Sequence, residues 1–184
     1  MLFLQTLYEK MRKHVHEDPA DRLRRGGATI GDTGVHIFDG AGAYIDYDFA
    51  HLFTCGHHVT ISPSKLLMHD ASMGFMLGCA RAGRITIGDY VFVGVGCTLL
   101  PGVTIGSRVV IGAGSVVTGD IPDNSVAVGS PAKVIGTYDE YIEKCRQDME
   151  KSPHYPPRDK CSPEEVRRMQ EEISKYGYLG TFQV

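Results

Sequence analysis

A period of six residues runs through the middle of the chain and constrains the fold more than any other feature of the sequence. From residue 87 to residue 117 every sixth residue is aliphatic, and glycine follows directly in four of the hexads that these residues open. The fifth position of each complete hexad is also small or apolar. The first positions are Ile87, Val93, Leu99, Ile105, Ile111 and Val117, and the fifth positions are Val91, Cys97, Val103, Val109 and Ser115.

This period matches neither an amphipathic helix nor a simple strand, whose periods are about 3.6 and 2. It fits a chain that forms a short strand and then turns, with the first residue pointing inward and glycine tolerating the turn. Three hexads complete a coil of about 18 residues, and coils stack as parallel strands roughly 4.8 Å apart. The pattern predicts an all-β core, a triangular prism of parallel strands. A turn-rich β-sandwich is the alternative, and six aliphatic residues in strict register disfavour it.

The same rhythm continues upstream in a less regular form. It then stops from about His69 to Arg84 and resumes at Ile85 or Ile87, which predicts an excursion loop over residues 70–84. Functional residues often lie on such loops above a rigid scaffold. The loop's apolar residues either form part of a ligand pocket or lid, or pack against another chain. The upstream positions are Ile37, Ala43, Phe49, Cys55, Ile61 and Leu67, and the apolar loop residues are Met73, Phe75, Met76 and Leu77.

The two ends of the chain differ from the repeat. Apolar residues at helical spacing predict a short helix over residues 2–17, before Pro19. Further helices are expected over Tyr138 to Met149 and from Pro163, which follows Ser162, to about Lys175. We therefore expect an N-terminal helical segment (1–27), the prism domain (28–136) and a C-terminal helical extension (137–184).

Composition excludes several functional classes. The formal net charge of −3 gives no electrostatic reason to expect binding to nucleic acid or to an anionic membrane. No run of about 18 apolar residues occurs, so membrane insertion is not expected. The five cysteines include no C-x-x-C pair, which disfavours a zinc ribbon or a redox motif. These features, with an N-terminus that lacks a signal peptide, favour a cytoplasmic protein.

Several stretches resemble the hexapeptide-repeat acyltransferases, in the branch of maltose, galactoside and capsular polysaccharide O-acetyltransferases. The similarity rests on the hexads and on the run from Asp120 to Ile135, which ends in Gly-Ser-Pro-Ala-Lys-Val-Ile. The upstream runs 44–52, 60–63 and 69–72 are similar to that branch too, so the resemblance covers roughly residues 28–136. It implies a left-handed β-helix, although parallel crossovers are normally right-handed. It also implies a homotrimer, with acetyl-CoA bound between neighbouring prisms.

The resemblance implies a role for individual residues as well. His69 matches the general base that takes a proton from the acceptor hydroxyl, and imidazole is suited to this near neutral pH. A backbone amide at Gly94 or Val95 would stabilise the oxyanion. Asp46 and Asp48 would line the pocket of a sugar or polysaccharide acceptor. The matched acetyl-CoA positions are Val95, Ala113, Thr118, Gly119 and Lys133, and no metal is expected.

At two of these positions the sequence departs from the family. Relatives have a polar residue where this chain has Val95 and a basic residue where it has Gly119, so contacts there would use the main chain. Lys133 would place a point charge on a phosphate of the cofactor.

Two other functions fit the same architecture. His51 and His69 are separated by one uninterrupted coil length, which would stack them about 5 Å apart, and His57 shares their hexad position. A zinc enzyme of the γ carbonic anhydrase type, with three histidines at a subunit interface, is therefore one alternative. A non-catalytic trimeric scaffold is the other, and the joint presence of His69, Ala113, Thr118 and Lys133 argues against it.

Overall fold

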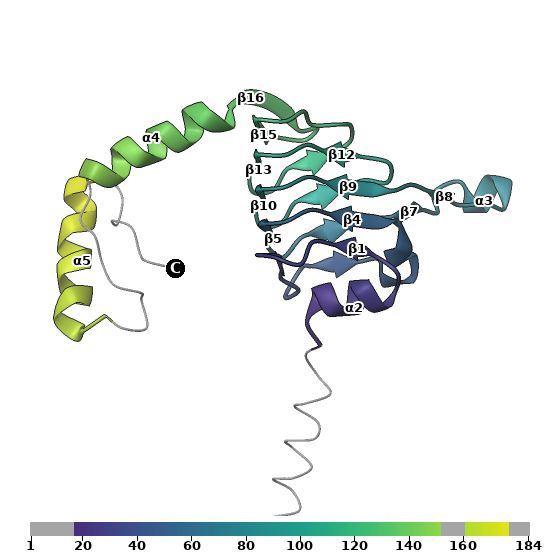
Figure 1. The fold of residues 1–184 in the computed structure, drawn as a ribbon, viewed down its shortest axis with the longest axis horizontal. Coiled ribbons are helices and arrows are strands. Elements are labelled where there is room, and N and C mark those ends of the chain that lie inside the picture. Colours follow the sequence, from purple (N-terminus) through teal and green to yellow (C-terminus); the bar gives the residue numbers. More distant parts are fainter. Residues whose placement is uncertain (1–16, 152–160, 177–184) are drawn as a thin grey trace, which may run out of the picture. The chain divides into compact units, whose positions relative to one another are not determined.

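The computed structural model describes residues 17–151 and 161–176, and its core is a prism of short parallel strands on three faces (Figure 1). Face A consists of β1 (Thr29–Ile30), β4 (Phe53–Cys55), β9 (Ile85–Ile87) and β12 (Thr104–Ile105). Face B consists of β2 (His36–Ile37), β5 (Val59–Ile61), β10 (Val91–Val93), β13 (Val109–Ile111) and β15 (Ser125–Val128), closed by the antiparallel β16 (Lys133–Thr137). Face C consists of β3 (Tyr44–Ile45), β6 (Lys65–Leu66), β11 (Thr98–Leu99) and β14 (Val116–Val117). The chain visits the three faces in turn.

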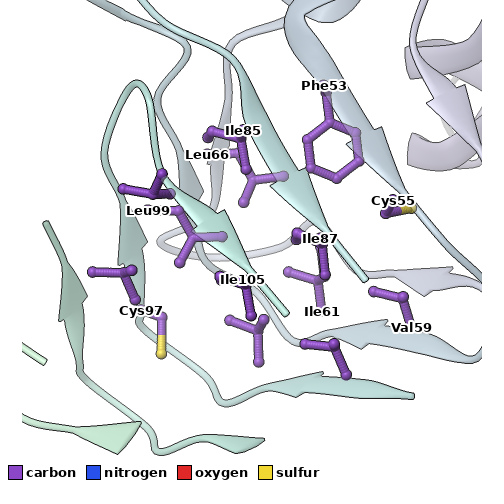
Figure 2. Packing of buried hydrophobic residues seen from close by; sticks show 14 of the residues in the cluster. Phe53, Cys55, Val59, Ile61, Leu66, Ile85, Ile87, Cys97, Leu99 and Ile105 are labelled. Atoms are coloured by element: carbon purple, nitrogen blue, oxygen red, sulfur yellow. The ribbon is translucent and has the colours of Figure 1, made fainter. Parts of the chain in front are cut away.

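The hexads set the register of this prism. Thr86 pairs with Thr104, and Thr98 pairs with Val116, so neighbouring strands on both faces lie eighteen positions apart. The first residue of every hexad is at most 2% exposed, and these side chains fill the interior, where Figure 2 shows several of them. Burying a branched aliphatic side chain contributes about 1.5–3 kcal/mol relative to leaving it exposed. The predicted prism of hexapeptide repeats is confirmed.

The upstream register differs from the prediction. Ile37, Cys55 and Ile61 are buried as expected, but Ile45 and Leu66 occupy the interior positions that were assigned to Ala43 and Leu67. Tyr44 pairs with Lys65, twenty-one positions on, because the chain inserts the 3₁₀ helix η1 (Tyr47–Leu52) at the corner between β3 and β4. The longer coil breaks the period of six. Phe49, which the rhythm placed in the core, therefore lies on this corner helix.

An arm leaves the prism where the repeat is interrupted. The antiparallel strands β7 (His69–Asp70) and β8 (Arg81–Ala82) form its two sides, and α3 (Gly74–Leu77) lies at its tip (Figure 1). The side chains of Phe75, Met76 and Leu77 at the tip are 101%, 81% and 68% exposed. The arm thus carries apolar side chains away from its own prism, which is compatible with both interpretations of this loop.

A polar ladder lines the corner between faces A and B. The His57 N–H donates to Asp89 Oδ1 (2.7 Å), the Asp89 N–H donates to Ser107 Oγ (3.0 Å), and the Ser107 N–H donates to Asp123 Oδ1 (2.7 Å). Successive coils approach so closely here that a Cβ at Gly88 would lie 2.7 Å from the Ser107 nitrogen. The hexad glycines at this corner, Gly88 and Gly106, are needed for this approach. The residue that turns the corner has a left-handed φ of 54–58° in four coils: His58, Tyr90, Arg108 and Asn124.

A short helix, α2 (Pro19–Arg25), covers the first coil and buries Ala20 and Leu23 in the core. The sequence analysis took Pro19 as the end of a helix, but here it is the first helical residue, a position that proline favours. Asp18 caps the helix, since its Oδ1 accepts the Ala20 N–H at 2.7 Å. The helix predicted over residues 2–17 lies outside the described residues, apart from its last position.

A second compact unit spans residues 139–184. It contains most of α4 (Tyr138–Lys151), and all of α5 (Pro163–Tyr176), which begins where the sequence predicts. A reciprocal capping box starts α5, because the Ser162 N–H donates to Glu165 Oε2 (2.7 Å) and the Glu165 N–H donates to Ser162 Oγ (3.2 Å). The same hydrogen bonds lower the pKa of Glu165. Among the described helices, none is both long and apolar enough to span a membrane.

Candidate active site

The strongest candidate for chemistry is a buried carboxylate paired with a histidine at the base of the arm. Asp46 follows β3, and His69 follows β6, the next strand of face C, so both leave the prism at the same corner. His69 Nδ1 forms a short hydrogen bond with Asp46 Oδ2. Asp46 is 3% exposed, whereas the His69 side chain is 30% exposed. The structure therefore holds one ring nitrogen from below and leaves part of the imidazole open to solvent.

This pairing differs from the expected role of Asp46. The family resemblance predicts its carboxylate in an acceptor pocket, whereas in the structure it is hydrogen-bonded to His69. An ionised carboxylate can only accept hydrogen bonds, so Nδ1 carries the proton of a neutral His69 and Nε2 carries the lone pair. Asp48, the second predicted acceptor residue, is exposed on η1.

Phe49 also lies in the candidate site, although the six-residue rhythm predicts it in the core. Its ring stacks on the His69 imidazole, with centroids 4.7 Å apart and planes inclined by 21°. Its ring also lies 6.3 Å from that of His51, at 30°. The rhythm assigned Phe49 to the core because the length of the inserted corner is not visible in a six-residue pattern.

The predicted oxyanion residues lie at the other edge of face C, between faces B and C. The Gly94 N–H already donates to the Ile111 carbonyl at 2.9 Å, which leaves Val95 as the candidate donor of the two. The Val95 side chain is 56% exposed, and its carbonyl accepts the Gly114 N–H at 2.9 Å. Ala113 lies directly above, because a Cβ at Gly94 would come within 2.6 Å of the Ala113 nitrogen. Gly94, Val95 and Ala113 therefore lie at one corner, where Gly94 is buried and Val95 and Ala113 are exposed.

The other predicted cofactor residues occupy different places. Thr118 and Gly119 follow β14, above the corner that carries His69, and a Cβ at Gly119 would meet no atom within 4 Å. Lys133 opens β16 on face B and is exposed. Across face C, Val95 and Leu100 are five residues apart, on the order of 15 Å along an extended chain. The candidate residues of one chain therefore form two separate edges.

The histidines of the zinc alternative do not gather at one place. His57 lies at the corner between faces A and B, where its Nδ1 is 3.1 Å from Asp32 Oδ1. The expected direct stacking of His51 on His69 assumed an uninterrupted coil, and η1 lengthens that coil; Phe49 is the ring that stacks on His69. Within residues 17–151 and 161–176 no group of three His, Cys, Asp or Glu side chains is placed to hold a metal ion.

Comparison with known proteins identifies the class of repeat. Residues 84–119 match the family described as bacterial transferase hexapeptide (six repeats). A search of curated protein sequences gives no significant match. The resemblance to hexapeptide-repeat proteins, stated above from the residues, is thus confirmed for this stretch.

One solved structure with a TM-score above 0.5 shares the fold, and two further structures are similar over part of the chain. A hexapeptide-repeat containing acetyltransferase from Vibrio cholerae is 24% identical, covers 73% of this chain and 89% of its own, and has a TM-score of 0.53. The complex of that protein with acetyl coenzyme A is 27% identical over 61% of each chain (TM-score 0.48). A maltose O-acetyltransferase from Clostridium difficile is 29% identical over 67% of this chain and 78% of its own (TM-score 0.44). The predicted left-handed parallel β-helix is confirmed as the fold class.

Proposed function

We propose that the chain is an acyltransferase that moves an acetyl group from acetyl-CoA to a hydroxyl of a sugar or polysaccharide precursor. The observation that carries this proposal is the hydrogen-bonded pair of His69 and Asp46 at the base of the arm. It lies on a prism whose repeats match a family of bacterial transferases. A partly exposed histidine side chain that is hydrogen-bonded to a buried carboxylate is the arrangement expected of a general base.

The chemistry assigns one step to each group. His69 Nε2 takes the proton of the acceptor hydroxyl as its oxygen attacks the thioester carbonyl. Asp46 keeps the opposite nitrogen protonated and stabilises the imidazolium that forms. The Val95 N–H donates to the oxyanion, and its collapse breaks the C–S bond. The imidazolium then returns its proton to the CoA thiolate, so the base is regenerated and no other reactant is needed.

The division of the candidate residues supports a site between two chains. His69, Thr118 and Gly119 lie at one edge of face C, and Val95 and Ala113 lie at the other. An acyl donor and a base on opposite edges of one prism meet only when the edge of a second copy is placed beside the first. We therefore propose a homotrimer in which each site takes one edge from each of two neighbours.

Each edge offers groups suited to acetyl-CoA. Small residues at Ala113 and Gly119 let the pantetheine arm approach the backbone, and Gly119 has open space above it. Lys133 is exposed and placed for a phosphate contact. Asp48 is the remaining exposed carboxylate for an acceptor hydroxyl, since Asp46 is occupied by His69. We expect a reducing compartment such as the cytoplasm, because the cysteines of the described residues form no disulfide.

The test is release of free CoA from acetyl-CoA, followed by thiol detection across mono- and oligosaccharides, amino sugars and serine. Release stimulated by one sugar, with the acetyl ester identified by mass spectrometry, is the expected result. Stimulation by serine or by an amine alone would refute the sugar as acceptor and keep the acyltransferase. Neither release nor a rise in melting temperature with acetyl-CoA would refute the proposal and favour a scaffold.

A further inference from the structure

The contacts of His69 extend beyond its carboxylate partner, and they point to a second residue that determines its geometry. We propose that Phe49 is a positioning residue, whose ring fixes the plane of the His69 imidazole so that Nε2 faces the acceptor hydroxyl. This inference rests on the proposed function in its catalytic part. Its structural part, the fixed ring, is independent of any activity.

A hydrogen bond to Asp46 alone does not define the orientation of the ring. A hydrogen bond at one ring nitrogen still allows the imidazole plane to rotate, because χ1 and χ2 of histidine can change together and the χ2 torsion is broad. The Phe49 ring lies against the imidazole face, 4.7 Å away and inclined by only 21°. Such rotation would drive the imidazole edge into the phenyl ring, so the stack removes the freedom that the hydrogen bond leaves.

Both contacts come from one short turn. The Phe49 N–H donates to the Asp46 carbonyl at 3.1 Å, which closes the turn that begins η1. Buried residues anchor the turn on both sides, because Ile45 is 8% and Ala50 is 0% exposed. The carboxylate and the phenyl ring are therefore held at a fixed separation. A rigid support of this kind is what a base needs, since small errors of placement cost large factors in rate.

The turn is also tied to the strand that carries His69. The Asp46 N–H donates to the Leu66 carbonyl at 3.2 Å, in the strand that precedes His69. Met68, next to His69, is fully buried, and its carbonyl accepts the Gly83 N–H at 2.9 Å. The backbone of His69 and the turn that holds its side chain thus belong to one hydrogen-bonded unit.

The stack has a second chemical consequence. On accepting a proton the imidazole becomes a cation, and the face of an aromatic ring attracts a cation by its quadrupole. Phe49 therefore interacts more strongly with His69 after proton transfer than before it. An interaction that strengthens along the reaction lowers the barrier rather than the Michaelis constant.

The test uses Phe49→Leu, which keeps apolar bulk and removes the ring, with Phe49→Tyr as the variant that keeps it. We expect Phe49→Leu to lower kcat about 10-fold with the KM for acetyl-CoA within about 2-fold. Phe49→Tyr should restore kcat to within about 3-fold of the wild type. The control is His51→Gln, which alters the other ring beside Phe49 and should leave kcat and the state of His69 unchanged.

A spectroscopic measurement tests the ring without activity. Nitrogen-15 spectra of histidine-labelled protein, at about pH 8.5, report which ring nitrogen carries the proton. The His69 signals, assigned by their loss in His69→Ala, should show one tautomer in the wild type and in Phe49→Tyr. In Phe49→Leu they should keep that tautomer, because Asp46 sets it, but they should broaden as the ring exchanges between orientations. Phe49→Met replaces Phe49→Leu if the latter does not fold.

The possible results separate this inference from the proposed function. Unchanged kcat and unchanged His69 signals in Phe49→Leu would overturn it. If the wild-type protein transfers no acetyl group, the proposed function fails. The nitrogen-15 spectra alone then test whether Phe49 positions the His69 ring. Broadened His69 signals in Phe49→Leu would then support positioning, and signals as sharp as those of the wild type would refute it.

Discussion

At the scale of single residues, the site depends on contacts between positions far apart in the sequence. His69 could be singled out from the sequence, because it lies where the repeat stops and matches a family position. Its partnership with Asp46 could not, since the two residues meet only through an inserted corner whose length no period reveals. The same insertion places Phe49 beside His69 instead of in the core. A six-residue repeat predicts where regular strands lie, but it does not predict how an inserted corner positions the residues around it.

Replacing Asp46 tests how far the carboxylate acts through the histidine. Asp46→Asn keeps the shape but removes the charge and lets the amide donate to Nδ1, which favours the wrong tautomer. We expect kcat to fall at least about 10-fold, with the KM for acetyl-CoA nearly unchanged. Steady-state kinetics check this, with Asp32→Asn, remote from the site, as the control. A change confined to the acceptor's KM would instead return Asp46 to the acceptor pocket.

The buried thiol of Cys55 predicts a pH dependence of stability. Burial raises the pKa of Cys55 to about 11, from an ordinary value near 9. The unfolded chain therefore loses this proton at lower pH than the folded protein. Stability is retained below about pH 9 and falls as the pH rises towards 11, by up to about 2–3 kcal/mol.

Urea unfolding at several pH values checks this dependence. Cys55→Ala should flatten the slope above about pH 9, relative to the wild type. An equal slope in both proteins would show that other groups cause the alkaline loss.

At the scale of elements, the glycines that end the strands control how closely coils stack. A Cβ at Gly88 would lie 2.7 Å from the Ser107 nitrogen and 2.8 Å from the Gly106 carbonyl carbon, whereas one at Gly119 would meet nothing within 4 Å. The hexads predicted that glycine follows the inward residue, but not which glycines are crowded. Crowding depends on the corner of the neighbouring coil, which a single hexad does not contain.

This contrast gives a matched pair of variants. Gly88→Ala should lower the free energy of unfolding by about 1–3 kcal/mol, because backbone atoms of the next coil must shift. Gly119→Ala should change it by less than about 0.5 kcal/mol. Urea denaturation measures both, and equal losses would contradict the packing described for the corner between faces A and B.

At the scale of the whole molecule, the proposed site needs edges from two prisms. The regular hexads allowed the fold class to be predicted, because each hexad repeats the same short strand and turn with its first residue pointing inward. The six-residue period does not predict quaternary structure. The proposal of a trimer rests instead on the candidate residues, which lie at two different edges of face C. The three exposed apolar residues at the tip of the arm also lie outside the prism of their own chain.

A trimer predicts complementation between inactive variants. His69→Ala removes the base from one edge, and Val95→Pro removes the amide donor from the other. Mixed trimers assembled from both should regain about a quarter of the wild-type activity, because about one interface in four then combines two intact edges. Native mass spectrometry measures how many chains assemble and how many of each variant they contain. A monomer, or mixed trimers without activity, would contradict a shared site.

The most direct test of the central claim compares the wild type with His69→Ala in two assays on the same samples. Equilibrium titration should give the same affinity for acetyl-CoA in both proteins, because the role proposed for His69 is that of a base and not of a cofactor ligand. Acceptor-dependent release of CoA should be at least about 10²-fold slower in His69→Ala. A near-normal rate in the variant, with acetyl-CoA bound as in the wild type, would contradict the assignment of His69 as the general base.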